Sequence, residues 1–349
     1  MGTASKPFFD QGQMEKNNLG VTVAELGEQQ VLQRLYQFCE PSMVGDDAAV
    51  LTPRAGHLLV VTTDMLVDGI HFCDRTTSPA DVGWRSAAAN LSDIAAMGAS
   101  PLGLTISLGL PETLPVSWLD QFYQGVADCL NTYGTAIIGG DLSRSPVITV
   151  SMTALGEVLP HQQILRSTAQ PGDAIVVTGV HGAARAGLEL LLHSDWGQAL
   201  SPTARIELQQ AHQRPQPRLD VIQVLKEFTP VPRVTGMDSS DGLADAVLQI
   251  CRASGMGAVI QQTQIPIPKS LRNAQVLTSE QAIEWALYGG EDFELVLCLP
   301  LSFAQELLER IDPTAMIIGH IVAEDDVTLI KSNGEKNLLD MQKGYQHFK

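Results

Sequence analysis

Apolar residues recur along the chain in helical and strand-like patterns. Residues 25–38 carry Leu, Val and Tyr on one side at helical spacing, which predicts a helix. Residues 58–63 are a short apolar run that ends on Asp64 and predicts a buried strand. Ser78-Pro-Ala-Asp81 combines a cap residue, an early Pro and an acid, which predicts the start of a helix over 78–99. Other predicted helices are 115–133, 183–193, 217–228, 243–253, 279–287 and 302–311, and other predicted strands are 104–110, 136–141, 147–158, 174–178, 258–265, 293–299 and 316–322.

The order of these elements favours an α+β fold in two domains over one doubly wound sheet. Helices and strands mix without a regular strand–helix–strand alternation. The 349 residues suffice for two domains. We expect a loosely ordered leader at 1–24, a first domain at 25–160 and a second at 161–349, with the linker near 158–168. The segment 44–51 is predicted as a turn that leads into a short strand.

Charge and composition restrict the partners. The formal net charge of −17 argues against nucleic acid and anionic membrane. It would also repel a bare anionic substrate unless metal cations lay between the two. No apolar stretch approaches the ~20 residues of a membrane span, and no secretory signal is visible, so we expect a cytoplasmic protein. The five scattered cysteines suggest thiols rather than disulfides or a zinc site.

Acidic residues beside small residues recur where elements begin or end. Each such site alone is more typical of a turn or a helix cap. Together they favour a cleft in which carboxylates hold Mg²⁺ against phosphates, while glycines let phosphate approach the backbone. Neither a P-loop nor the protein-kinase motifs occur, so phosphate handling would depend on metals and backbone. The six sites are Gly45-Asp46-Asp47, Thr62-Thr63-Asp64, Asn90 with Asp93, Gly139-Gly140-Asp141, Asp238-Ser-Ser-Asp241-Gly242 and Gly289-Gly290-Glu291-Asp292.

The sequence resembles the thiamine-monophosphate kinase family of the PurM-like, aminoimidazole-ribonucleotide-synthetase-like, ATP-binding superfamily. The likeness runs from about Glu25 to Phe348. It is carried by VGDDAAV, TTDMLVDGIHF, NLSDIAAMGASP, IIGGDLSRS, LRSTAQPGD, RPQPRL, DSSDGLADA, YGGEDFEL and the terminal KGYQHF. The resemblance implies an N-terminal α/β domain whose sheet pairs in a homodimer, with ATP near the subunit interface. It also implies a C-terminal α/β sandwich domain, and ATP and thiamine monophosphate as substrates.

The resemblance also implies roles for individual residues. Mg²⁺ ligands are expected at Asp47, Thr62, Thr63, Asp64, Asp93, Asp141, Asp238 and Asp241. Nucleotide contacts are expected at Gly140, Asp141, Arg166 and Ser240, and contacts to thiamine phosphate at His71, Glu291 and Tyr345. Met43 and Ser239 depart from the family pattern without removing a ligand.

Chemistry alone does not decide the role of several of these residues. Without the resemblance, His71 would be a core histidine, and Tyr345 a packing residue. Arg166 would equally well pair with an acid across the domain junction. Asp46 and Asp68 would either support the ligands from behind or be structural, and Asp292 would be either a metal-site helper or a loop cap.

The expected reaction is direct phosphoryl transfer from ATP, assisted by several Mg²⁺ ions. A phosphate monoester has a second pKa of about 6, so its oxygen is already a nucleophile and needs no general base. The alternatives are another PurM-like ATP-dependent synthetase, or a non-catalytic module that binds divalent metal or nucleotide. Residues 1–38 contain no Cys, unlike the selenophosphate synthetase pattern.

Overall fold

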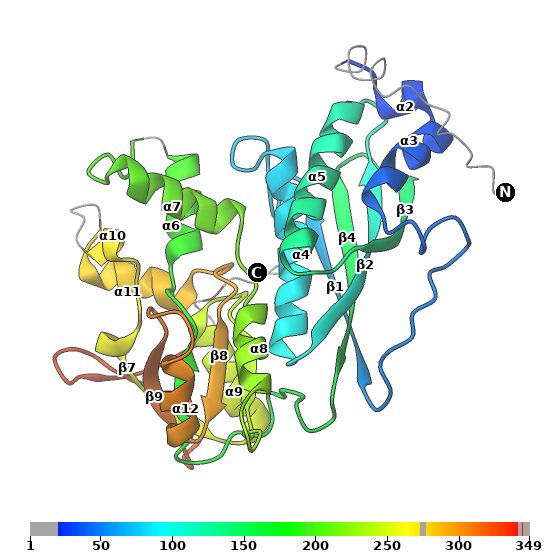
Figure 1. Ribbon diagram of the computed structural model, residues 1–349. Helices are drawn as coiled ribbons and strands as arrows, with labels where there is room; N and C mark the ends of the chain where they lie inside the picture. Colours follow the sequence, from blue (N-terminus) through cyan, green and yellow to red (C-terminus); the bar gives the residue numbers. More distant parts are fainter. Residues whose placement is uncertain (1–19, 194, 273–276, 341–343, 345–349) are drawn as a thin grey trace.

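A four-stranded sheet forms the centre of the first domain. The computed structural model describes residues 20–193, 195–272, 277–340 and 344. The sheet has the strand order β1-β4-β2-β3, and only β2 and β3 run parallel within it. Helices α4 (Pro79–Ala96) and α5 (Val116–Thr132) lie side by side against one face (Figure 1). The strands are β1 (Leu58–Val67), β2 (Ser100–Leu110), β3 (Ile137–Arg144) and β4 (Thr149–Val158).

Two glycines allow α4 and α5 to pack closely. The Ser78 hydroxyl accepts a hydrogen bond from the Asp81 amide, and Pro79 follows it, as the sequence predicts for this start. A Cβ at Gly83 would lie 2.0 Å from the carbonyl oxygen of Phe122, and one at Gly125 would lie 1.8 Å from that of Ala80. The backbones therefore approach too closely for any side chain at these positions.

The N-terminal segment departs from the predicted single helix over 25–38. Gly27, at φ 79°, separates α2 (Val23–Leu26) from α3 (Glu28–Leu35), and a 3₁₀ turn at Tyr36–Phe38 follows. Residues 20–24, expected within the leader, are held by hydrogen bonds such as that from the Val23 amide to the Leu114 carbonyl, at 2.9 Å. The predicted strand within 44–51 is wrong, because turns and bends run through 41–48 and no strand follows before β1.

A seven-stranded sheet in the order β11-β10-β7-β9-β5-β8-β6 forms the second domain. Within it, the β7–β10 pair is parallel and the other pairs are antiparallel. Strands β6, β10 and β11 and helices α7 and α10 were not predicted. The strands are β5 (Ala174–Val177), β6 (Thr235–Asp238), β7 (Gly257–Gln261), β8 (Leu295–Leu299), β9 (Met316–Val322), β10 (Val327–Ile330) and β11 (Lys336–Leu338). The helices are α6 (Ala183–Leu192), α7 (Pro202–Gln213), α8 (Leu219–Lys226), α9 (Leu243–Ser254), α10 (Lys269–Arg272), α11 (Ser279–Tyr288) and α12 (Leu301–Leu308).

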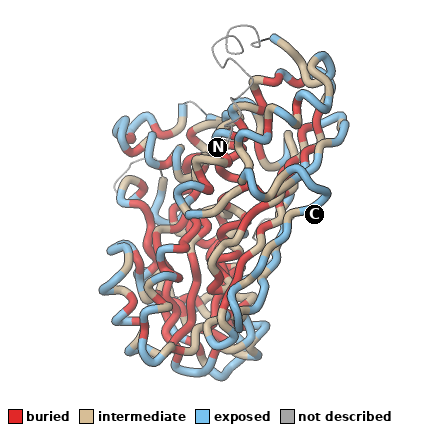
Figure 2. Tube along the Cα trace, turned by 45° about the vertical axis from the view of Figure 1, so that its right-hand side comes forward, coloured by how far each residue is buried: buried red, intermediate tan, exposed pale blue. Residues whose placement is uncertain are grey.

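Strand β8 divides the interior into two cores. Leu295, Leu297 and Leu299 belong to the core shared with α4 and α5 of the first domain. Val296 and Cys298 point to the other face, where they pack with residues of α6, α9 and α11. Figure 2 shows the buried positions gathered in the interior of the molecule and the exposed positions along its outer edges. Strand alternation thus makes the second sheet a wall common to both domains.

The other face of the first sheet is exposed in the single chain. Leu59, Val61 and Met65 on β1 are 50%, 58% and 56% exposed. They alternate along the strand, so they share one face, opposite to the helices. Within the described residues this apolar row has no covering element. Among all the residues that the structure describes, no helix has the length and hydropathy needed to cross a membrane.

Candidate active site

Strand β1 and helix α4 bring the first predicted ligands together. Thr62 and Asp64 alternate along β1 and face α4. The Thr62 hydroxyl donates a hydrogen bond to the carboxylate of Asp93 on α4. Burial, with repulsion from Asp93 and Asp241, raises the pKa of Asp64 to about 6. The carboxylates of Asp93 and Asp241 are therefore both close enough to act on Asp64.

Asp238 joins this group from the second domain. It ends β6, and its carboxylate accepts a 2.7 Å hydrogen bond from the Ser92 hydroxyl on α4. Burial, and then the charge of Asp93, raise the pKa of Asp238 to about 7, while burial also raises that of Asp93. The positive charge of Arg166 opposes part of both shifts. The sequence motifs around Asp64, Asp93, Asp238 and Asp241 thus meet at the junction of the domains.

This donor set fits a divalent cation. The groups are carboxylates and a hydroxyl, which are the oxygen ligands that Mg²⁺ takes. Their mutual repulsion is the electrostatic condition that a bound cation would relieve. Across the ranges that the structure describes, no three His, Cys, Asp or Glu side chains are placed to hold one metal ion by themselves. An ion here would therefore need water or substrate phosphate oxygens to complete its shell, which is the usual situation for Mg²⁺.

Three predicted ligands lie apart from this group in the single chain. Thr63 points to the open face of the sheet, where its hydroxyl accepts a 3.3 Å hydrogen bond from Thr153. Asp141 is exposed on β3, at the opposite edge of the sheet from β1, in register with Ser107. Asp47 is exposed among the turns of 41–48, and no hydrogen bond or ion pair within the described residues joins it to the others.

Gly140 has a structural reason to be glycine. A Cβ at this position would lie 2.2 Å from the carbonyl oxygen of Ile106 on β2. Gly140 thus allows close approach of β2 and β3, besides any contact with phosphate. The structure supports the requirement for glycine but leaves its nucleotide role a prediction.

The loop 238–242 packs directly against the loop 289–292. The Glu291 amide donates a 2.7 Å hydrogen bond to the Ser240 carbonyl. A Cβ at Gly290 would lie 2.6 Å from the same carbonyl oxygen. Glu291 itself has φ 69°, a left-handed conformation that is uncommon outside glycine. The fold therefore places Ser240, a predicted nucleotide contact, beside Glu291, a predicted substrate contact.

Arg85 is a site residue that sequence reasoning missed. It lies on α4 and is 2% exposed, and its guanidinium donates a 2.5 Å hydrogen bond to the Glu291 carboxylate. The same guanidinium contacts the ring and carbonyl of His212 at the end of α7. Burial, and then the charge of Arg85, lower the pKa of His212 to about 2. A neutral histidine and a buried arginine thus fix the Glu291 side chain from across the domain junction.

Glu291→Gln is expected to lower the free energy of unfolding by about 2 kcal/mol, because it leaves the Arg85 charge buried without its carboxylate. The figure is below that of a fully buried pair, since the Glu291 side chain is 35% exposed. Urea unfolding of both proteins at neutral pH measures the difference. Glu207→Gln, at an exposed position on α7, is the matched control and should change stability little. Equal effects of the two substitutions would contradict this account of the ion pair.

The remaining predicted residues are placed as follows. Arg166 is exposed and donates a 2.8 Å hydrogen bond to the Gln249 side chain on α9. Among the described residues it forms no direct ion pair with an acid, although its charge acts on Asp93 and Asp238. His71 is half-buried after β1, and its Nδ1 accepts a 3.0 Å hydrogen bond from the Val67 amide. Tyr345 lies outside the described residues. The substrate roles of His71 and Tyr345 stay predictions.

Comparison with known proteins identifies the family. Residues 45–158 match the family model of the AIR synthase related protein, N-terminal domain, and residues 170–332 match that of its C-terminal domain. The thiamine-monophosphate kinase of Synechococcus elongatus is 52% identical over 330 residues, which cover 94% of this chain and 98% of the relative. The chain belongs to the thiamine-monophosphate kinase family.

Solved structures of this family have the same two-domain fold. The thiamine-monophosphate kinase of Stenotrophomonas maltophilia aligns with a TM-score of 0.75 at 33% identity, covering 88% of this chain and 95% of that one. A structure of AaThiL complexed with AMPPCP and TMP aligns with a TM-score of 0.72 at 32% identity, covering 93% of this chain and 98% of that one. The likeness covers both domains, so the predicted two-domain α+β PurM-like fold is confirmed.

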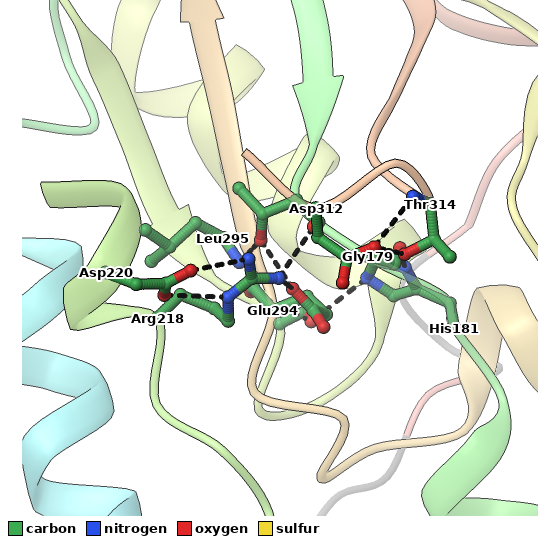
Figure 3. Close-up of polar contacts among 10 residues, drawn as sticks. Gly179, His181, Arg218, Asp220, Glu294, Leu295, Asp312 and Thr314 are labelled. Atoms are coloured by element: carbon green, nitrogen blue, oxygen red, sulfur yellow. Dashed lines mark hydrogen bonds and ion pairs between the residues drawn. The ribbon is translucent and has the colours of Figure 1, made fainter. Parts of the chain in front are cut away.

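A second polar network holds the C-terminal end of the kinase-family motif YGGEDFEL, residues 288–295, in place (Figure 3). The buried Arg218 donates 2.6 Å hydrogen bonds to the Glu294 carboxylate and to the Thr178 carbonyl. Its other nitrogens bind Asp220 at 2.9 and 3.0 Å. A Cβ at Gly179 would lie 2.2 Å from a Glu294 carboxylate oxygen, so a side chain there would displace this carboxylate from Arg218. The RPQPRL motif thus fixes the end of the loop that carries Glu291.

Asp292 is a helix cap. Its carboxylate accepts hydrogen bonds from the Gly182 and Ala184 amides, at 2.6 and 2.9 Å, at the start of α6. Burial raises its pKa to about 7 against the effect of these bonds. Of the two roles that the sequence leaves open for this residue, the structure supports the cap.

His181 ties the loop 238–242 to the second sheet. Its Nε2 lies 3.1 Å from the Ser239 hydroxyl, and its Nδ1 lies 3.2 Å from the Gly179 carbonyl (Figure 3). The residue is fully buried, and burial lowers its pKa from 6.5 to about 4. Protonation is therefore easier in the unfolded chain than in the folded protein. The stability that the neutral ring contributes is present above pH 6.5 and is lost as the pH falls toward 4.

The His181→Asn variant is expected to show a weaker acid dependence of stability than the parent protein. Each pH unit below 6.5 corresponds to about 1.4 kcal/mol for this group, hence about 2 kcal/mol between neutral pH and pH ~5. Urea unfolding of each protein at the two pH values gives the stability that it loses on acidification. This loss should be about 2 kcal/mol smaller in His181→Asn than in the parent protein. His193→Asn, at an exposed histidine, is the control. An unchanged pH dependence in His181→Asn would contradict the assignment.

Proposed function

We propose that this chain phosphorylates thiamine monophosphate with ATP to give thiamine diphosphate. The observation that carries the proposal is the meeting of Asp64 and Asp93 with Asp238 beside the loop of Glu291. Support comes from the related AaThiL, whose structure is a complex with AMPPCP and TMP, and from the kinase relative at 52% identity. The two substrates are polyanions. A group of carboxylates can hold them when metal ions lie between the carboxylates and the substrate phosphates.

The residues divide the task between the domains. Thr62, Asp64, Asp93, Asp238 and Asp241 would hold Mg²⁺, which when bound neutralises phosphate charge and orients the transferring group. Gly140, Arg166 and Ser240 would contact the nucleotide phosphates. His71, Glu291 and Tyr345 would contact thiamine monophosphate, with Arg85 fixing Glu291. Asp47, Thr63 and Asp141 would complete the ligand set in the assembled protein.

The transfer proceeds directly, without a phospho-enzyme. The acceptor phosphate is ionised near neutral pH, so no side chain has to remove a proton from it. The protein's contribution is to orient two phosphates in line and to shield their charges. ATP with a chiral γ-phosphate tests this step. Inversion at phosphorus is expected, and retention would require two displacements.

The domain division and assembly follow the same proposal. Residues 25–160 form the ATP-binding and dimerisation domain, and 161–349 contribute nucleotide and substrate contacts after a leader at 1–24. The exposed apolar row of Leu59, Val61 and Met65 supports pairing of the first sheets in a homodimer. Asp141 and Thr63 lie on that same open face, which agrees with ATP near the subunit interface. The five free thiols are consistent with a cytoplasmic setting.

A nucleotide titration separates this proposal from a non-catalytic metal- or nucleotide-binding module. ATP should bind tightly only with Mg²⁺, and ADP should then appear only after thiamine monophosphate is added. Binding without any ADP release under both conditions would favour the module.

A further inference from the structure

A cavity of about 370 Å³ lies at the domain junction, apart from the carboxylate site. Its walls are the segment 160–165 that links the domains, one side of α8, and the segment 231–234 that leads into β6. Its volume falls in the range of about 300–1,000 Å³ that is usual for small-molecule sites. Neither the proposed substrates nor the predicted site residues use it.

The lining is apolar with cationic groups and lacks carboxylates. Ile164, Ile222, Leu225 and Val234 supply apolar walls, and Gln162 and Gln163 add amide groups. Lys226, Arg233 and His161 also line the cavity, whereas none of the described residues around it is Asp or Glu. In a chain with a net charge of −17, a cavity without acids is the place where an anion would meet the least repulsion.

The charges around the cavity leave one cation in excess. The Arg233 guanidinium is paired with the Asp173 carboxylate at 2.7 Å. The Lys226 ammonium donates a 2.8 Å hydrogen bond to the Ser100 hydroxyl and forms no ion pair within the described part of the chain. Burial, and then the nearby Arg54, lower the pKa of Lys226 against the attraction of Glu157, a carboxylate that is itself paired with Arg54.

We propose that this cavity binds a small organic monocarboxylate, with its carboxylate on Lys226 and its apolar body against Ile164, Ile222 and Leu225. One unpaired ammonium matches one carboxylate, and the net charge of −17 on the whole chain disfavours a more highly charged anion. The apolar walls require a hydrocarbon or aromatic body rather than an inorganic anion. The site is thus separate from the phosphate chemistry at the carboxylates.

The cavity wall is joined to both elements that carry the carboxylates. The Ile164 amide donates a 3.2 Å hydrogen bond to the Met97 carbonyl, at the end of α4. The next residue, Leu165, accepts a 3.2 Å hydrogen bond from the Gly236 amide in β6. Since α4 carries Asp93 and β6 ends on Asp238, an occupant pressing on this wall acts on the segment that connects them. Ligand in the cavity is therefore expected to change the affinity of the carboxylate site for a divalent cation.

Fluorine NMR on the full-length protein with para-fluorobenzoate as the probe tests the site. The probe signal should broaden in a saturable way, whereas neutral para-fluorobenzamide should bind at least about tenfold more weakly. Lys226→Gln should weaken para-fluorobenzoate binding by a similar factor, and Val231→Trp should abolish it by filling the cavity. Lys269→Gln, at an exposed lysine on α10, should leave binding unchanged. Thermal melting shows whether each variant is folded.

No saturable binding of the probe, or equal binding by the parent, Lys226→Gln and Val231→Trp, would overturn the proposal. The coupling is tested separately with Mn²⁺, whose binding is followed by electron paramagnetic resonance. The Mn²⁺ affinity should shift by about twofold or more when para-fluorobenzoate saturates the cavity, and this shift should vanish in Val231→Trp. An unchanged Mn²⁺ affinity would refute the link between the two sites. Neither measurement depends on kinase turnover, so its failure would leave the proposed function standing.

Discussion

Asp64→Asn is expected to lower phosphoryl transfer by about 100-fold or more while leaving the protein as stable as the parent or slightly more stable. The substitution keeps the size of the side chain but removes a charge that a metal ion would need. Burial and two neighbouring carboxylates raise the pKa of Asp64 to about 6, so ionising this group costs free energy in the folded protein. We therefore expect the charge of Asp64 to bind a metal ion rather than to stabilise the fold.

The measurement is ADP release at saturating Mg²⁺ together with urea unfolding in the absence of metal. Asp68→Asn is the matched control, because Asp68 follows β1 directly and is assigned no ligand role. It should keep turnover near that of the parent. Near-normal turnover in Asp64→Asn would remove Asp64 from the metal site. A large loss of stability would show instead that the carboxylate holds the fold.

Asp141→Asn should be as inactive as Asp64→Asn, yet a mixture of the two variants should recover about one quarter of the parent activity. The two residues lie on β3 and β1, at opposite edges of the sheet. Their side chains also face opposite sides, because Asp141 is in the same row as Met65 rather than Asp64. One chain therefore cannot bring them together, whereas a dimer that joins the two sheets can place the β3 edge of one subunit beside the β1 edge of the other.

The recovery follows from the symmetry of a dimer. If each site takes Asp64 from one subunit and Asp141 from the other, half of the randomly mixed dimers contain both variants, and each of these has one intact site of two, hence about one quarter. The mixture is prepared by co-expression or by exchange of subunits, and each variant alone is the control. Absence of recovery with verified mixed dimers would contradict the shared site.

The sequence predicted much of the fold because local patterns decide it. The cap at Ser78 begins α4 as expected, and apolar runs correspond to β1, β2 and β8. Strand β1 is not the buried strand that was predicted, because one of its faces is exposed. Two of the mispredicted segments have local reasons. Gly27 interrupts the first helix through its positive φ, and β6 has only four residues, too few for a visible pattern before its motif.

The site was predicted less completely, because its geometry depends on contacts between distant residues. Arg85 sits within an ordinary helical sequence, and nothing near it indicates that Glu291 will lie against it. Similarly, nothing in the sequence around Ser92 indicates that its hydroxyl donates a hydrogen bond to Asp238. Strand alternation could have predicted that Thr63 points away from Thr62 and Asp64. All three residues were instead assigned to one site because they belong to one motif.

One assay tests the central claim most directly. The protein is incubated with ATP, Mg²⁺ and thiamine monophosphate, and the products are separated by chromatography. We predict that thiamine diphosphate and ADP form in equal amounts, and that neither forms when Mg²⁺ is chelated or thiamine monophosphate is left out. ADP without thiamine diphosphate, or no turnover by a protein that binds both substrates, would contradict the account.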